Sequence, residues 1–495
     1  MSAIPIDQFR PRVRLPVRAA LRLAPLGDIW HKPALSAVSA LAVALFPLVL
    51  IGRLDLVLYA AAGAMCALYG HGLPYAARAG ALAGVVLGML SSTAVALVTA
   101  ALTDSIAIRV AVAAILAGLH KAACDVTRIG PPGNVVLTFI AGGAAFVPQR
   151  LSDVPLHMGI GVLGGIVAWL VGMAPWLVRP DGPERIAVAR ALESVARLTR
   201  ARDQDTDLHQ ARHAAAAAIN AAWQTLLRAG HPGRSQGLQR LLARAETAAA
   251  RASADELATL ARHPTADADT LTSYAYDLRK GRPLPTPSPS DPGTAAAEQA
   301  ELAGVAAERI ASPHGARTHR APHALARFVV ALARGRRVVA AVSAGAALAG
   351  WASMALGVGK PYWAVVTAAA VFAANATLSW SRALQRVVGN LIGVALFTLL
   401  APVTKLGALA LLITVLALQF VTEAAVTRNY WLGSVFVTPM AIMMTEFAGA
   451  QPVPDVELRE GADVAAGEWW STVLPHERIA AAERAGHRQL AELAT

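Results

Sequence analysis

The chain has 495 residues, of which 55% are apolar and only 15% are charged, and its mean hydropathy is +0.47. A soluble domain carries more charge, so this composition indicates a multi-span membrane protein. The formal charge of +12 would suit a nucleic-acid-binding protein, but the arginines cluster beside apolar runs, where a membrane surface attracts them, and we expect no nucleic-acid partner. Two cysteines, Cys66 and Cys124, are too few for a disulfide framework.

Residues 1–30 form a basic arm without a signal-peptide core, and we expect this arm to remain in the cytoplasm. Residues 31–180 then hold six apolar segments, at 34–51, 56–69, 79–102, 106–120, 134–147 and 156–178. Two of these, 56–69 and 134–147, are shorter than the ~20 residues of a perpendicular span, so we expect them to be broken, tilted or shielded by neighbours. This region is the predicted first membrane half, with six spans.

Residues 181–320 are polar and rich in Ala, Arg and Glu at helical spacing, which predicts a cytoplasmic helical domain. A proline-rich linker at 281–293 interrupts it, because closely spaced prolines forbid a continuous helix. A second membrane half, residues 321–450, is predicted to have five spans, at 338–358, 362–378, 387–402, 406–425 and 431–448. Residues 451–495 form a polar tail.

The distribution of basic residues gives the orientation. If the segments alternate, one side receives the arm, Arg78, Lys121 with Arg128, Arg179 with Arg185, Arg334 to Arg337, Arg382 with Arg386, and Arg428. The positive-inside rule makes that side the cytoplasm. Because six spans return the chain to its starting side, both halves begin in the same orientation. The sequence therefore predicts an all-α polytopic protein of the inner membrane, with two parallel-repeat halves flanking a cytoplasmic helical domain.

A repeated motif supports the two halves. Residues 126–138 read VTRIGPPGNVVLT, and residues 426–438, 300 positions later, read VTRNYWLGSVFVT. Both copies open an apolar segment and place an arginine, Arg128 or Arg428, just before it. A basic residue at a fixed place before two membrane segments indicates a duplicated membrane unit.

Two interpretations of the charged residues near these motifs stay open. Arg128 and Arg428 could anchor at the lipid headgroups, with Asp125 and Glu423 as local partners. Alternatively, the arginines contact a transported anion, and Glu423 or Asp125 couples protons to transport because burial raises the pKa of its carboxyl group. The duplication of the arginine keeps the second interpretation open beside the first.

A second group of candidates lies in the second half. Arg382 and Arg386 are four residues apart, so they share a helical face and would repel each other unless an anion sits nearby. That anion is either a lipid phosphate or a carboxylate substrate at the cytoplasmic entry. Tyr362 and Trp363 fit an aromatic belt at a segment edge or a wall of the substrate path.

Glycine pairs four residues apart suggest close helix packing. Gly389 and Gly393 in the second half have counterparts in Gly80 and Gly84 in the first, and small residues at this spacing let membrane helices approach. We expect both pairs to lie at helix contacts.

No catalytic signature is present: the chain has no phosphate-binding loop, no GxSxG, no HExxH and no CxxC. The protein is therefore not expected to be an enzyme, and we expect no cofactor. His209 and His213 stand four residues apart, but a solvated helix face explains them better than zinc, so no metal site is expected.

The stretch 359–393 resembles the fusaric acid resistance and aromatic acid exporter family of bacterial inner-membrane proteins. The residues that match its pattern in order are Tyr362, Trp363, Arg382, Arg386, Gly389 and Gly393. Asn390 stands where this pattern has a threonine. The resemblance implies membrane halves around a cytoplasmic helical domain, and proton-driven efflux of aromatic or other organic acids.

One departure bears on this function. By the 300-residue offset, residues 454–477 should form a twelfth span, but this stretch cannot cross lipid unaided, because it contains Asp455, Glu457, Arg459, Glu460, Asp463 and Glu468. Our first hypothesis is secondary-active efflux of an organic anion. A passive anion channel and a membrane-anchored scaffold that acts through the helical domain are the alternatives. Besides lipid and the anion, the sequence leaves open a second copy of the chain and a periplasmic accessory protein as partners.

Overall fold

The computed structural model of the chain is helical throughout the residues that it describes, without a strand among them. These are residues 20–203, 207–229, 232–253, 264–285, 332–357, 361–371 and 376–449, with short pieces at 296, 299–300, 302–304 and 328–330. The polar tail 451–495 and most of the proline-rich linker therefore lie outside the described residues. The all-α fold class is confirmed.

The membrane helices follow the predicted apolar segments one for one. Seven helices of the described residues are long and apolar enough to cross a membrane. They are α2 (His31–Leu50), α4 (Tyr75–Leu102), α5 (Ile106–Thr127), α7 (Val154–Met173), α14 (Arg336–Ala355), α16 (Ala376–Leu400) and α17 (Ala408–Arg428). Shorter apolar helices are α3 (Val57–Ala64, between 3-10 turns), α6 (Asn134–Ala144), α15 (Pro361–Val371) and α18 (Tyr430–Gly449, apolar to Met444). The chain is thus a multi-pass membrane protein.

The chain separates into two units. The first consists of residues 1–68, 86–168 and 332–495, and the second of residues 69–85 and 169–331. The first unit holds most of the membrane helices of both halves.

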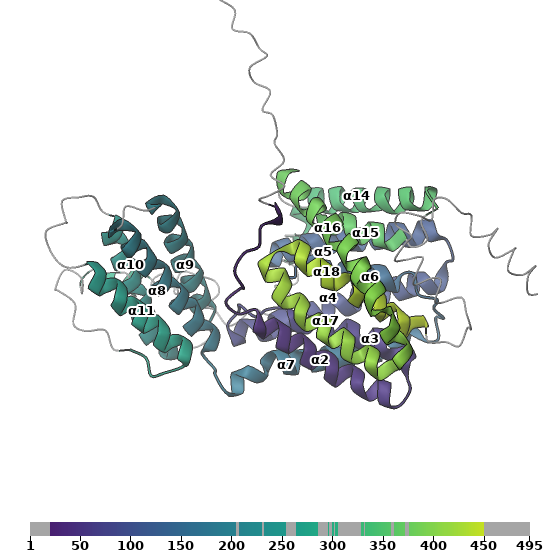
Figure 1. Cartoon of the computed structure of the whole chain (residues 1–495), viewed down its shortest axis with the longest axis horizontal. Coiled ribbons are helices and arrows are strands. Elements are labelled where there is room, and N and C mark those ends of the chain that lie inside the picture. Colours follow the sequence, from purple (N-terminus) through teal and green to yellow (C-terminus); the bar gives the residue numbers. More distant parts are fainter. Residues whose placement is uncertain are drawn as a thin grey trace, which may run out of the picture. The chain divides into compact units, whose positions relative to one another are not determined.

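Within the first unit, two contacts between a helix of the first half and a helix of the second half each have a matching contact between the counterparts of those helices. α2 packs on α17, and α14, which takes the place of α2 in the second half, packs on α5, the counterpart of α17 (Figure 1). In the same way α3 packs on α18, and α15 packs on α6. Two copies of one unit that face each other across a two-fold axis would make these paired contacts. The packing supports a parallel repeat, which stays a prediction.

The short helix α3 is shielded by a close contact with α7. A Cβ atom added to Gly63 would lie 2.1 Å from the carbonyl oxygen of Gly161, and one added to Gly164 would lie 2.2 Å from that of Ala60. Such small residues allow helix backbones in a membrane to touch. A helix of eight residues is therefore held inside the helical layer, although it is too short to span lipid by itself.

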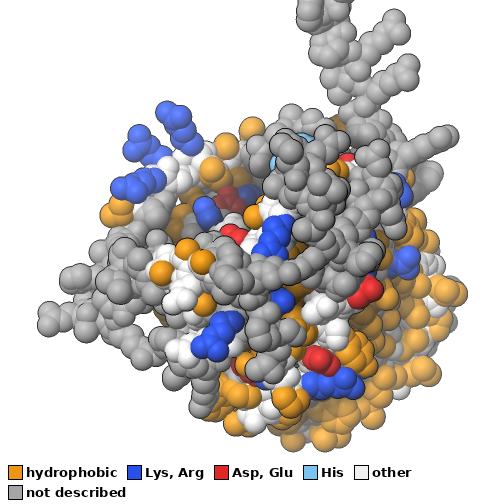
Figure 2. Space-filling view, turned by 90° about the vertical axis from the view of Figure 1, so that its left-hand side faces the viewer, with side chains coloured by type: hydrophobic (Ala, Val, Ile, Leu, Met, Phe, Trp, Pro, Cys, Tyr) orange, Lys and Arg blue, Asp and Glu red, His pale blue; other side chains and the backbone are white. Residues whose placement is uncertain are grey.

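The outer faces of the membrane helices are apolar. Large apolar side chains that are more than half exposed occur on several of them, including Leu50, Leu87, Leu163, Leu348 and Leu399. Figure 2 shows apolar side chains gathered without interruption along the lower right of its view. Such surfaces suit a lipid environment.

The second unit contains a helical bundle of α8 (Gly182–Asp203), α9 (Leu208–Arg228), α10 (Pro232–Ser253) and α11 (Pro264–Lys280). α8 packs on the other three helices, which lie alongside it in Figure 1. Leucines such as Leu192, Leu226 and Leu241 are fully buried between them. An ion pair at 2.6 Å joins Arg279 to Glu193, and burial raises the pKa of the Glu184 carboxyl group.

Candidate anion-binding site

The site is built where α16 and α18 touch. A Cβ atom added to Gly389 would lie 2.5 Å from the carbonyl oxygen of Trp431, and one added to Gly393 would lie 2.9 Å from that of Val435. Both glycines therefore face the backbone of α18. Their absent side chains let the polar groups of the two helices meet.

Gly80 and Gly84 behave differently. A Cβ atom on either glycine would meet no atom within 4 Å, so the expected helix contact is wrong for this pair. α4 meets α7 through another face, on which Val86 lies against Gly165, and in this contact the glycine belongs to α7.

Polar side chains line the α16–α18 contact as a row, which we call the polar seam. Tyr430, Ser434 and Thr438 follow one another at four-residue spacing on one face of α18, opposite Arg386 and Asn390 of α16. The Nη1 atom of Arg386 donates to the Tyr430 hydroxyl at 3.2 Å, and Thr438 hydrogen-bonds to the Asn390 side chain, also at 3.2 Å. The Ser434 hydroxyl donates to the Tyr430 carbonyl oxygen.

Arg386 is the charged residue of the polar seam, and few of its neighbours compensate its charge. The residue is only 5% exposed, and its Nε atom is buried without a hydrogen-bond partner. Among the described residues no carboxylate lies within 4.0 Å of its guanidinium group, and its hydrogen-bond partner is the neutral Tyr430 hydroxyl. Because a cation in a membrane helix is stable only when it is paired or hydrated, Arg386 is suited to receive an anion.

Arg78, a second buried arginine on a membrane helix, shows what a purely structural role looks like. It is 3% exposed, and its guanidinium group donates to the backbone carbonyl oxygens of Gly70, His71 and Gly172 at 2.7 to 3.2 Å. These bonds tie the turn before α4 to the end of α7. Backbone carbonyl oxygens therefore accept the hydrogen bonds of the Arg78 guanidinium group, whereas the Nε–H group of Arg386 has no acceptor.

The other predicted arginines lie at helix surfaces. Arg382 is exposed, one turn before Arg386 on α16. Arg128 is exposed and caps the end of α5 in a left-handed conformation, with φ of 50°. Arg428 is the last residue of α17 and is also exposed. The structure thus separates Arg386, which is buried, from three arginines at accessible positions.

Arg428 holds a segment of the N-terminal arm that the sequence did not associate with it. Residues 20–27, which we call the N-terminal strap, lie against the junction of α17 and α18 (dark purple in Figure 1). The Nε atom of Arg428 donates to the Ala24 carbonyl oxygen at 3.2 Å, and the backbone N–H of Ala24 donates to the Arg428 carbonyl oxygen at 2.9 Å. Further strap carbonyl oxygens accept from the side chains of Gln385, Asn429 and Trp431.

Because of this contact, we expect substitutions of the two repeated arginines to have different effects on the strap. In Arg428→Gln, hydrogen–deuterium exchange of residues 20–27 should rise by about fivefold, the factor expected for one lost hydrogen bond of ~1 kcal/mol. Arg128→Gln is the matched control, since no hydrogen bond joins Arg128 to the strap in the structure, and it should leave exchange there unchanged. Equal effects of both substitutions would show that Arg428 does not hold the strap.

Tyr362 and Trp363 lie between the halves, in an aromatic cluster with α6. The Tyr362 ring lies 5.7 Å from that of Phe146, and the Trp363 ring 5.4 Å from that of Phe139. Tyr362 is buried, and the Nε1 atom of Trp363 is buried without a partner. No interaction that the structure records among the described residues joins either ring to Arg386.

The two candidate proton-coupling acids have different environments. The Asp125 side chain is 50% exposed and pairs with Lys121 on the same helix, so it lacks the buried position that the sequence suggested for a proton-coupling acid. Glu423, on α17, is half-buried and accepts a hydrogen bond from Gln419 at 3.0 Å. Nearby Thr422 has a buried hydroxyl without a partner. Of these two acids, only Glu423 lies within the helical layer.

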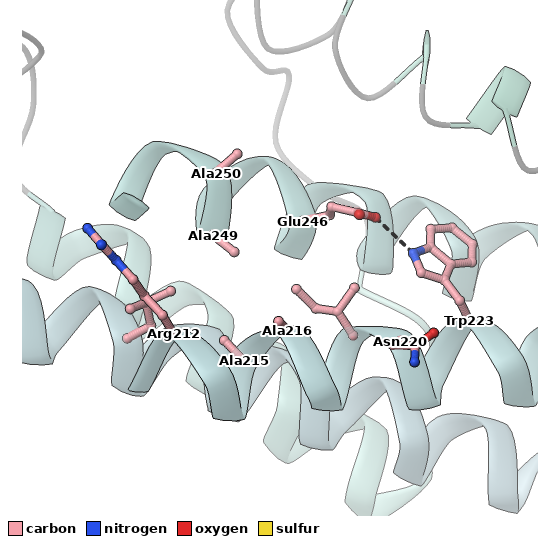
Figure 3. Close-up of a pocket in the computed structure, with 10 residues that line it drawn as sticks. Arg212, Ala215, Ala216, Asn220, Trp223, Glu246, Ala249 and Ala250 are labelled. Carbon is pink, nitrogen blue, oxygen red and sulfur yellow. Dashed lines mark hydrogen bonds between the residues drawn. The ribbon is translucent and has the colours of Figure 1, made fainter. Parts of the chain in front are cut away.

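The helical bundle offers a shallow groove of about 370 Å³ between α9 and α10, shown in Figure 3. Four alanines at positions 215, 216, 249 and 250 line it, and Trp223 donates to Glu246 at 2.8 Å at one end, away from Arg212. None of the predicted site residues lies here. His209 and His213 contact each other at 3.2 Å, and no group of three metal-ligating side chains occurs in the described part of the chain.

Comparison with known families gives one result. Residues 346–474 match the family described as fusaric acid resistance protein-like. The match includes the whole polar seam and runs past α18 to residue 474, outside the described residues. Comparisons with curated proteins and with solved structures give no significant match. The resemblance in residues 359–393 is therefore confirmed, and the chain is a polytopic membrane protein that carries a fusaric acid resistance protein-like domain.

Proposed function

We propose that this protein is a secondary-active exporter of organic acids across the inner membrane, and that Arg386 contacts the transported carboxylate. The observation that carries this proposal is a buried guanidinium group with an unpartnered Nε atom and no acidic partner among the described residues, inside the region that matches the fusaric acid resistance protein-like family. An arginine presents paired N–H groups in the fork geometry that a carboxylate accepts.

The polar seam supports a route for the anion. Tyr430, Ser434 and Thr438 extend from Arg386 along α18 in steps of one helical turn, about 6 Å each. Their hydroxyl groups can donate to a carboxylate that leaves the arginine. Since polar side chains are costly to place in an apolar layer, a row of them that runs into the helical layer fits a transport path better than a lipid contact.

The exposed arginines take a supporting role in this proposal. Arg382, one turn before Arg386, and Arg128 would raise the local anion concentration at the cytoplasmic approach. Arg428 would hold the N-terminal strap beside that approach, and Glu423 is the acid placed to exchange protons. The N-terminus and the helical bundle would both be cytoplasmic.

A flux measurement tests this proposal against a passive channel. Purified protein in liposomes should carry benzoate, as a probe aromatic carboxylate, and an imposed pH gradient should drive its accumulation faster than in protein-free liposomes. All fluxes are counted above those of protein-free liposomes, because neutral benzoic acid crosses a bilayer unaided. Benzoate that only equilibrates, with a current insensitive to the pH gradient, would indicate a channel. Absence of benzoate flux together with absence of acetate flux would overturn the transport proposal.

A further inference from the structure

We propose that His120, a residue buried in the first membrane half, is a proton-binding site of this transporter and makes its anion flux dependent on pH. This inference rests on the transport function proposed above. His120 lies on α5 and is 6% exposed. It is not among the acids that the sequence suggested for proton coupling.

One ring nitrogen of His120 is held and the other is free. The Nδ1 atom lies 3.3 Å from the Thr138 hydroxyl oxygen on α6, whereas the Nε2 atom is buried without a hydrogen-bond partner. With Nδ1–H donated to Thr138, the lone pair is on Nε2. A proton that arrives there forms a new N–H bond and turns the neutral imidazole into an imidazolium cation.

A second unpartnered group lies on the same face of α6. Asn134 is four residues before Thr138, is 9% exposed, and has a buried side-chain nitrogen without a partner. Residues four apart on a helix are neighbours, so Asn134 lies beside Thr138, the residue that His120 contacts. Leaving a buried polar group unpaired costs about 1–3 kcal/mol, and both Asn134 and His120 carry such a group.

The second half shows that the fold does not require a histidine here. At the 300-residue offset, Phe420 takes the place of His120, and its ring packs against Trp30 with centroids 5.5 Å apart. The counterpart of Thr138 is Thr438, which bonds instead to Asn390 of the polar seam. An apolar aromatic ring thus fills this position in one half. The imidazole in the other half adds a titratable group that packing does not demand.

No nearby acid fixes the charge state of the ring. The helices packed on α5 are α6, α14 and α15. In their described residues α6 has no titratable side chain, α15 has only Tyr362, and α14 has only Arg336 and Arg337, which are exposed. On α5 itself Lys121 and Asp125 pair with each other, and the Cys124 thiol, four residues after His120, is the titratable group on the same helix face. A protonated His120 is therefore an uncompensated positive charge in the membrane unit, which favours an anion there, and by linkage a bound anion favours the proton.

The test uses the full-length protein in liposomes with two readouts. In the first, benzoate flux is measured between pH 5 and pH 9 in the wild type, in His120→Phe, which copies the second half, and in His120→Gln, which keeps a polar side chain but cannot titrate. We expect wild-type flux to follow, as a function of pH, the titration curve of a group that binds one proton. Both variants should lose this dependence while they retain the wild-type flux of the high-pH limit.

The second readout does not depend on transport. Nitrogen-15 NMR of labelled histidine should show, among the rings that titrate, one ring whose signal disappears from the spectrum of His120→Gln. If wild-type flux is absent but this ring titrates, the transport proposal fails and the proton site stands. If the His120 ring stays neutral throughout, or if both variants keep the wild-type pH dependence, the inference is overturned.

Discussion

Arg386→Gln should lower benzoate flux at least about 30-fold while the protein still inserts and folds. Removing one partner of a buried charged hydrogen bond costs about 2–5 kcal/mol, and the lower figure corresponds to this factor. The loss should be large because Arg386 is 5% exposed and its hydrogen-bond partner is a neutral tyrosine hydroxyl, so no other described residue replaces its charge. Initial rates of benzoate uptake in liposomes measure the effect.

Arg382→Gln is the matched control for this prediction. Arg382 carries the same charge on the same helix, one turn away, but it is exposed, so water and salt screen it. We expect flux to fall by less than about fivefold in this variant. Arg386→Lys, which keeps the charge and loses the fork of donors, should lie between the two. Equal losses in Arg382→Gln and Arg386→Gln would mean that burial does not distinguish these arginines.

Gly389→Ala should lower the stability of the folded protein. Its Cβ atom would lie 2.5 Å from the Trp431 carbonyl oxygen, so α16 and α18 must separate. Overpacking of this kind costs about 1–3 kcal/mol, more than the ~1 kcal/mol that alanine gains over glycine in a helix. The thermal unfolding midpoint of the purified protein should fall.

Gly80→Ala, at the place that the sequence equates with Gly389, is the control. A Cβ atom at Gly80 meets open space, so the substitution should leave the midpoint unchanged or raise it slightly. A lowered midpoint in Gly80→Ala, with no change in Gly389→Ala, would contradict the helix contacts described above.

The apolar segments and their number could be predicted because burial in lipid imposes long apolar runs that are visible without any tertiary information. The short segments at 56–69 and 134–147 were recognised for the same reason, and α3 and α6 occupy them. The exposed fraction of a single residue could not be predicted in this way, since it depends on which helix packs on which face. Arg382 and Arg386 are indistinguishable by spacing, and only the contact with α18 buries one of them.

The features that the sequence did not reveal depend on contacts between distant residues. The strap is held by bonds from side chains to backbone carbonyl oxygens about 400 positions away, and such acceptors have no sequence signature. The prediction placed the glycine contact of the first half at Gly80 and Gly84 of α4. In the structure, Gly161 and Gly165 of α7 contact the neighbouring helices instead. His120 did leave a signal, as a histidine in an apolar run where the other half has phenylalanine.

The central claim is that Arg386 holds the transported anion, and a calorimetric titration of the purified protein with benzoate tests it most directly. The wild type should show saturable binding. Arg386→Gln should show none at the same concentrations, with an unchanged thermal unfolding midpoint in the absence of benzoate. Binding of benzoate to Arg386→Gln with the affinity of the wild type would contradict the account.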